Sequence, residues 1–192
     1  MRKIKTLVTV WRPGDGGSLC GRDVPSDDEL RAAVPAEVDL GFLEPGQKLS
    51  EHLAGVEVLY GPLPEEDLPK ADRLRWVQLN STGADSMMYE AFARSGIMLT
   101  TLGGAITVTV AEHALALLFA LARNLHLQRD LQREKKWQVA CGVDIGGLKL
   151  GLLGFGRIGR AIAFRAQAFG MDIVAVDAFP GGKPDCVGAV WG

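Results

Sequence analysis

Residues 149–159 read KLGLLGFGRIG, an apolar run of five residues followed at once by three glycines in the spacing G-x-G-x-x-G. The glycines are Gly154, Gly156 and Gly159. A hexapeptide of this kind binds the pyrophosphate of a dinucleotide when it follows a buried strand and opens a helix. In a chain with 24 glycines the hexapeptide alone is weak evidence, so its surroundings decide the interpretation.

The residues after the hexapeptide complete a strand-turn-helix-strand unit. Apolar residues recur at helical spacing over residues 157–169, namely Ile158, Ala161, Ile162, Ala166 and Phe169. Gly170 ends this helix, and Met171 to Val176 is typical of a second buried strand. Asp177 follows eighteen residues after Gly159, near the place where an acid that binds the cofactor's ribose is expected.

The unit predicts a dinucleotide site formed by Gly154, Phe155, Gly156, Arg157, Ile158, Gly159 and Asp177. Gly154 allows a tight turn, Gly156 lets the backbone approach a phosphate, and Gly159 lets the helix pack close to the strand. The helix N-terminus presents unpaired N–H groups to the pyrophosphate. Asp177 accepts hydrogen bonds from the ribose and repels an additional phosphate, which predicts NAD rather than NADP. The alternative is that Asp177 is only a solvated strand end.

Before this unit, strands and helices alternate. Strands are expected at 4–11, 38–43, 56–60, 75–80 and 97–100, and helices at 27–34, capped by Ser26, and at 87–94. Such alternation predicts an α/β fold with parallel strands. The pair Gly103-Gly104 interrupts the pattern, and we therefore expect one domain at residues 1–102 and a second at 103–192.

A single long helix is expected from Thr107 to about Arg133. Its middle, Ala114 to Ala122, is apolar on every face, whereas its end is charged. A helix that is apolar all round needs cover on two sides. We therefore expect it to lie between domains or between subunits.

Composition excludes several classes of protein. A net charge of -2 and a pI near 5.9 give no basic surface for nucleic acid or anionic lipid. The longest apolar run has nine residues, less than half of what a membrane span needs. Three separated cysteines predict neither a disulfide framework nor a metal site. The expected partner is a small molecule, and the expected location is the cytoplasm.

With these residues in view, the chain resembles the D-isomer-specific 2-hydroxyacid dehydrogenase family, which includes glyoxylate/hydroxypyruvate reductases and phosphoglycerate dehydrogenase. Besides the glycine hexapeptide, the resemblance rests on residues 74–85 (LRWVQLNSTGAD) and 110–118 (VAEHALALL). It implies a flavodoxin-like parallel-sheet substrate domain followed by an incomplete Rossmann NAD-binding domain. It further implies NAD-dependent oxidation or reduction of small D-2-hydroxy or 2-keto acids of the glyoxylate/hydroxypyruvate type, and a homodimer in the full-length form.

The resemblance also implies substrate-binding residues. In the family, the loop that matches Tyr60 and Gly61 and the turn that matches Ser81, Thr82 and Gly83 bind the substrate carboxylate, largely through backbone N–H groups. Gly61 and Gly83 would leave such donors accessible to an anion, although both glycines could equally serve only to make turns. By the same resemblance, the start of the long helix around Val110 approaches the nicotinamide side of the cofactor.

No catalytic residue is assigned. The family's substrate-binding Arg and its His–Glu acid/base pair would follow Gly192, so the resemblance implies a truncated chain that is inactive by itself. Glu112 and His113 are adjacent on a helix and therefore face different directions, and a packed or interdomain histidine is the better interpretation. Two alternatives to an enzyme remain, a corepressor-like NAD-binding regulatory protein and an inert truncated product.

Overall fold

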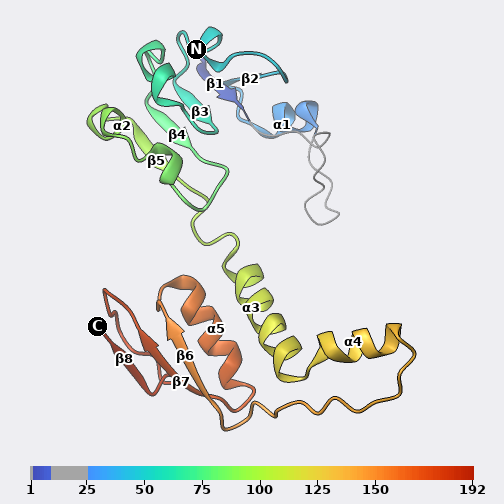
Figure 1. Ribbon diagram of the computed structural model, residues 1–192. Helices are drawn as coiled ribbons and strands as arrows, with labels where there is room; N and C mark the ends of the chain where they lie inside the picture. Colours follow the sequence, from blue (N-terminus) through green and yellow to red (C-terminus); the bar gives the residue numbers. More distant parts are fainter. Residues whose placement is uncertain (1, 10–25) are drawn as a thin grey trace. The chain divides into compact units, whose positions relative to one another are not determined.

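The computed structural model describes residues 2–9 and 26–192 and divides the chain into two compact units, Met1–Gly103 and Gly104–Gly192 (Figure 1). Each unit contains one sheet in which the strands are all parallel, together with helices. The expected α/β class with parallel strands is confirmed. The division falls one residue from the expected one between residues 102 and 103.

The first unit is built on a five-stranded sheet in the order β2-β1-β3-β4-β5, which is the flavodoxin-like order. Its elements are β1 Ile4–Val8, α1 Asp27–Ala33, β2 Val38–Phe42, η1 Leu49–Glu51, β3 Val58–Tyr60, η2 Glu65–Lys70, β4 Trp76–Gln78, η3 Asp85–Met87, α2 Glu90–Arg94 and β5 Met98–Thr100. The last residues of the strand expected at 4–11 lie partly outside the described residues. The helix expected at 87–94 forms only over α2, with a short 3-10 turn before it.

Local chemistry explains where α1 begins. The Ser26 hydroxyl accepts a hydrogen bond from the Glu29 amide, and the Glu29 carboxylate accepts one from the Ser26 amide at 2.7 Å. These reciprocal bonds satisfy donors that a helix start otherwise leaves without partners. The expected cap at Ser26 is thus confirmed.

Apolar side chains from the strands and from the segments between them form the core of the first unit. The buried members are Leu7, Leu53, Val56, Leu59, Leu63, Leu74, Val77, Leu79, Met87 and Phe92. Because they fix the strands at their centres, the loops that follow β3 and β4 start from a rigid support.

The second unit contains a three-stranded parallel sheet in the order β6-β7-β8, with α5 and α3 packed beside it (Figure 1). Its elements are α3 Thr107–Ala122, α4 Leu125–Arg133, β6 Lys149–Leu153, α5 Arg157–Gln167, β7 Asp172–Val176 and β8 Ala189–Trp191. This strand order matches the first three strands of a dinucleotide-binding fold. The core comprises Leu115, Leu152, Phe155, Ala163, Ala166, Met171, Ile173, Ala175 and Val187. Strand β8 was not expected from the sequence.

The expectation of one long helix from Thr107 to Arg133 was wrong. Helix α3 ends at Ala122, and α4 leaves at an angle of 62°. Asn124, between them, has a left-handed backbone with φ 53°, a conformation that asparagine tolerates better than most residues. The Ala122 carbonyl accepts a hydrogen bond from the Val143 amide at 2.7 Å, and the Asn124 side chain donates to the Cys141 carbonyl. The returning segment therefore caps α3 and turns the chain.

The apolar middle of α3 is only partly covered. Ala111 and Leu115 are buried, whereas Leu117 and Leu121 are 53% and 68% exposed. These exposed leucines are the side chains for which the sequence predicted a second covering surface. Within the described residues no single helix is long and apolar enough to cross a membrane, and only the bent pair α3–α4 reaches the required length and composition.

A substitution at Gly159 tests how closely α5 approaches the turn that precedes it. A Cβ atom at this position would lie 2.3 Å from the Gly154 carbonyl oxygen. We expect Gly159→Ala to lower the free energy of unfolding by about 1–3 kcal/mol, despite the better helix propensity of alanine. Chemical denaturation measures this. Gly151→Ala is the control, because no atom lies within 4 Å of its Cβ position; equal stability of the two variants would contradict the close approach.

Candidate functional site

The three glycines of the segment between β6 and α5 differ in the structural reason for glycine at each position. Gly154 has φ 96°, a backbone conformation that favours glycine, and its amide donates to the Val176 carbonyl at the end of β7. Gly159 permits the close approach to Gly154. At Gly156, in contrast, a Cβ would have no atom within 4 Å, so this glycine is not required by packing within the chain. Its open surroundings fit a backbone that a ligand approaches.

The N-terminus of α5 is open to an anion. Gly156 is the N-cap residue and provides no side-chain hydrogen bond, and the first turn holds no acidic residue. The first hydrogen bond along the helix runs from the Arg160 amide to the Gly156 carbonyl. The amides of Arg157, Ile158 and Gly159 therefore have no intrahelical acceptor. Such a helix start attracts a phosphate by its N–H groups and its dipole.

Asp177 lies directly beside this turn. One carboxylate oxygen accepts a hydrogen bond from the Phe155 amide at 2.5 Å, and the other accepts one from the Phe179 amide at 2.9 Å. These two bonds, with a weaker attraction from Arg160, hold the pKa of the Asp177 carboxyl below its ordinary value. A carboxylate can accept about four hydrogen bonds, so acceptor sites remain for two hydroxyl groups.

Helix α3 runs beside α5 in the same direction. Three approaches occur in the same order along the two segments. A Cβ at Gly104, just before α3, would lie 3.9 Å from the Arg157 side chain, Glu112 lies 3.8 Å from Arg165, and the Phe119 ring packs against that of Phe169, just after α5. Val110 lies two residues before Glu112, which pairs with Arg165 in the last turn of α5. The expectation that Val110 approaches the nicotinamide side of the cofactor stays a prediction.

The proposed substrate residues follow neighbouring strands of the first unit. Tyr60 is paired with Gln78 across β3 and β4, so the segment after each strand begins at the same edge of the sheet. Ser81, Thr82 and Gly83 follow β4 and are exposed. No described residue accepts a hydrogen bond from the amides of these three residues. The Ser81 hydroxyl donates to the Gly83 carbonyl at 2.8 Å and shapes the turn. Three accessible N–H groups in one turn can bind an anion.

Gly61 differs from the expectation of an accessible donor. Its amide donates to the Gln78 carbonyl at 2.9 Å, which extends the bonding between β3 and β4 by one residue. Its φ of 131° and a Cβ position only 1.9 Å from the Thr9 hydroxyl oxygen require glycine for packing. This geometry favours the alternative that Gly61 has a conformational role in the chain rather than a role in binding an anion.

His113 is exposed, so the expectation of a packed side chain is wrong, whereas the alternative of an interdomain histidine stays a prediction. The neighbouring Glu112 forms an ion pair with Arg165 on α5, so it is engaged away from any acid/base role with the histidine. The described residues contain no group of three or more His, Cys, Asp and Glu side chains that could hold a metal ion.

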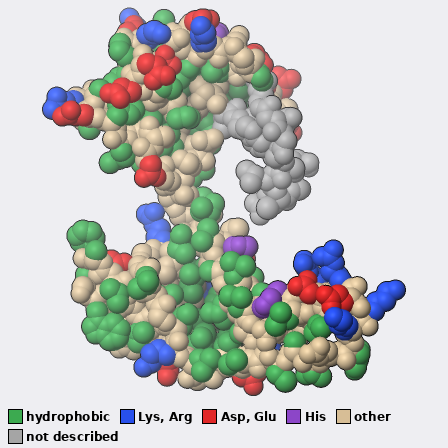
Figure 2. All heavy atoms as spheres, in the orientation of Figure 1, with side chains coloured by type: hydrophobic (Ala, Val, Ile, Leu, Met, Phe, Trp, Pro, Cys, Tyr) green, Lys and Arg blue, Asp and Glu red, His purple; other side chains and the backbone are tan. Residues whose placement is uncertain are grey.

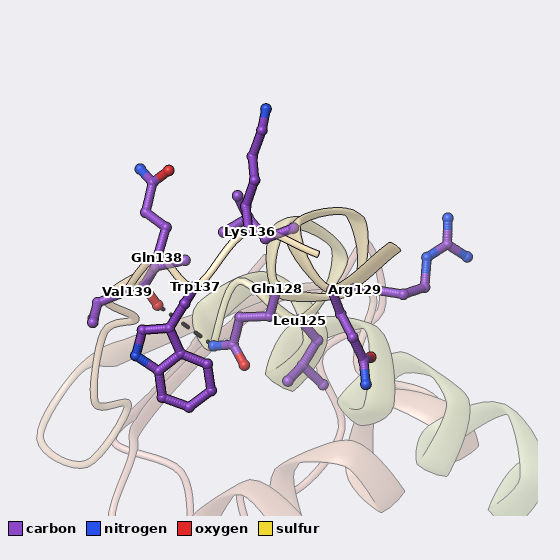
Figure 3. A pocket seen from close by; sticks show the side chains of 10 residues that line it. Leu125, Gln128, Arg129, Lys136, Trp137, Gln138 and Val139 are labelled. Atoms are coloured by element: carbon purple, nitrogen blue, oxygen red, sulfur yellow. Dashed lines mark hydrogen bonds between the residues drawn. The ribbon is translucent and has the colours of Figure 1, made fainter. Parts of the chain in front are cut away.

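A separate hollow of about 640 Å³ lies between α4 and residues 136–140 (Figure 3). Leu125, Gln128 and Trp137 line it, and the Gln128 side chain donates to the Ala140 carbonyl at 3.4 Å. Lys and Arg side chains gather near the end of α4 (Figure 2). None of the lining residues belongs to the glycine turn or to the Ser81–Gly83 turn, so this hollow is distinct from both.

Sequence comparison identifies the second unit. Residues 115–186 match the NAD binding domain of the D-isomer specific 2-hydroxyacid dehydrogenases. The chain is 38% identical over 129 residues to a glyoxylate reductase of Korarchaeum cryptofilum, covering 64% of this chain and 39% of that protein. It is 36% identical over 143 residues to a glyoxylate reductase of Pyrococcus furiosus, covering 68% and 43%.

These matches support the D-isomer-specific 2-hydroxyacid dehydrogenase family for this partial chain. The family resemblance and the NAD cofactor expected from the sequence are thus confirmed. The fold agrees with a solved family member from Aeromonas salmonicida, with a TM-score of 0.78 and 23% identity over 98% of this chain and 58% of that one. The chain spans about two fifths of the length of the two glyoxylate reductases.

Arg160 was not singled out from the sequence, although its side chain contacts Phe155 in the glycine turn. Its guanidinium lies 4.6 Å from the centre of the Phe155 ring and donates to the Gly182 carbonyl at 2.9 Å. No spacing rule predicts these contacts, because they depend on how residues 178–188 fold back toward α5. Phe155 itself is 3% exposed, so its ring belongs to the core while its amide binds Asp177.

The pH dependence of stability tests the bonds to Asp177. A carboxyl whose pKa is lowered by folding stabilises the folded state above its ordinary value of 3.8 and loses this contribution as the pH falls through the lowered pKa. We expect Asp177→Asn to lower the thermal midpoint at neutral pH and to lose this effect in acid. Thermal unfolding between about pH 3 and pH 7 measures the difference.

Asp172→Asn, which removes an exposed carboxylate at the other end of β7, is the control for the loss of one charge. A difference between wild type and Asp177→Asn that stays constant down to the lowest pH would contradict the role of the two amide bonds.

Proposed function

We propose that this chain forms part of an NAD-dependent oxidoreductase that acts on the CH–OH group of small D-2-hydroxy acids, or in reverse on 2-keto acids of the glyoxylate/hydroxypyruvate type. The observation that carries the proposal is the uncapped start of α5 beside the carboxylate of Asp177, within a domain of the NAD-binding family. Two glyoxylate reductases among the relatives support the substrate class.

In this proposal, the amides at the start of α5 and the turn at Gly154, Phe155 and Gly156 bind the pyrophosphate. The free acceptor sites of Asp177 bind the adenosine ribose hydroxyls, and its charge disfavours an additional phosphate there. Val110 lies toward the nicotinamide side. When bound, NAD accepts or supplies the hydride; the residues of this chain hold it in place.

The amides of Ser81, Thr82 and Gly83 are proposed to bind the substrate carboxylate. They lie in an exposed turn, are not engaged by any described acceptor, and follow a strand whose end is fixed by bonds to its neighbours. Backbone donors suit this role because they cannot change charge and keep a constant geometry. Tyr60 and Gly61 would support the turn through the strand contact at Gln78 rather than by donating to the substrate from Gly61.

We further propose a homodimer for the full-length form and a cytoplasmic location. The exposed leucines of α3 support the dimer, because a helix face of this kind is stabilised by a second covering surface. Sedimentation of the full-length protein as a single-chain species would contradict the dimer.

Asp177→Ala is the direct test of the NAD site. Because hydrogen bonds to a charged group are lost, we expect NAD affinity to fall by about tenfold or more, as measured by calorimetry. Asp172→Ala, at the opposite end of the same strand, is the matched control and should bind NAD as the wild type does. Equal NAD affinity of wild type and Asp177→Ala would refute the ribose-binding role.

No acid/base pair is assigned within these 192 residues, and an assay of turnover by this chain alone tests that interpretation. We expect no oxidation of NADH with glyoxylate or hydroxypyruvate, since Glu112 is paired with Arg165 and His113 has no carboxylate partner among the described residues. Absorbance of NADH measures this, with the chain's NAD affinity determined in parallel. Steady oxidation of NADH by the purified chain would show that residues within it supply the proton transfer.

A further inference from the structure

Arg160 is tied to both sides of the proposed ribose site. Its guanidinium stacks over the ring of Phe155, whose amide donates to the Asp177 carboxylate, and it donates to the carbonyl of Gly182, five residues after Asp177. The side chain therefore bridges the glycine turn and the segment that follows the acid. A side chain with two such contacts has lost most of its rotamer freedom.

Two further observations relate the cation to Asp177 and to the loop that follows it. Its attraction contributes to the lowered pKa of that carboxyl, after the two backbone hydrogen bonds. A Cβ at Gly181 would lie 3.1 Å from the second terminal nitrogen of the guanidinium, so the loop after Asp177 folds directly onto Arg160.

We propose that Arg160 is a specificity-determining residue, a fixed cation whose contribution to cofactor choice is opposed by Asp177. This inference rests on the proposed role of Asp177 in binding the ribose. A guanidinium has five N–H donors, and only one of them is used by the Gly182 carbonyl. With the acid in place, the carboxylate repels a phosphate on the ribose. Without it, the cation is left beside the same ribose and favours that phosphate.

In this proposal Asp177 sets the preference for NAD, and Arg160 determines which cofactor is favoured once that carboxylate is removed. An uncharged side chain at position 160 would leave Asp177→Ala with weak binding of both cofactors. With arginine at position 160, Asp177→Ala is instead expected to shift the cofactor preference from NAD toward NADP. Because the guanidinium is held by Phe155 and Gly182, little reordering is needed before it can contact a phosphate.

The test is a double-mutant cycle on the affinities for NAD and NADP, measured by calorimetry on the wild type, Asp177→Ala, Arg160→Gln and the double variant. Glutamine retains a donor for the Gly182 carbonyl and removes the charge. We expect Asp177→Ala to bind NADP about tenfold or more tightly than the double variant does. Arg165→Gln, which removes another cation from α5, should not change NADP binding in the Asp177→Ala background.

The outcomes separate the two proposals. If Asp177→Ala and the double variant bind NADP equally, Arg160 does not determine specificity, even where Asp177→Ala has weakened NAD as proposed. If Asp177→Ala leaves NAD affinity unchanged, the proposed ribose-binding role of Asp177 is refuted, and with it the inference that depends on that role. Thermal unfolding of each variant distinguishes a loss of fold from a loss of binding. Arg160→Lys, which keeps the charge without the planar fork, should restore part of the NADP affinity of Asp177→Ala relative to the double variant.

Discussion

Gly159 of α5 lies so near the Gly154 carbonyl, just after β6, that a Cβ at residue 159 would be 2.3 Å from that oxygen. A side chain at residue 159 would move the first turn of the helix away from the strand. The amides of that turn would then no longer lie beside the end of β7, where Asp177 is held by the Phe155 amide. The arrangement of helix start, turn and acid thus depends on one position at which no Cβ is present.

Within that arrangement, two opposite charges are placed by backbone groups. The partial positive charge at the α5 N-terminus has no side-chain cap, and the negative charge of Asp177 is stabilised by two amides. A dinucleotide contains the complementary groups, an anionic pyrophosphate and neutral ribose hydroxyls. Because both protein charges are fixed before any ligand binds, the cost of ordering them has been met during folding.

The sequence predicted most of what local patterns determine. Glycine spacing, helical periodicity and the cap at Ser26 each depend on residues close together in the chain, and the structure has the turn, α5 and α1 accordingly. The break between α3 and α4 could not be predicted in this way, because it is fixed by the Val143 amide binding the Ala122 carbonyl from a distant segment. The contacts of Arg160 escaped prediction for the same reason.

The first unit shows how strand bonding limits which amides can bind a ligand. In an open parallel sheet, ligands are expected beyond the carboxyl ends of the strands, where the strand order reverses. In the order β2-β1-β3-β4-β5 this point lies between β1 and β3. There, however, the amide and hydroxyl of Thr9 both donate to the Tyr60 carbonyl, and Gly61 packs against Thr9. Among the described residues at this point the Tyr60 carbonyl and the Gly61 amide are therefore engaged within the sheet, whereas the amides of the Ser81–Gly83 turn, after the adjacent strand β4, have no described acceptor.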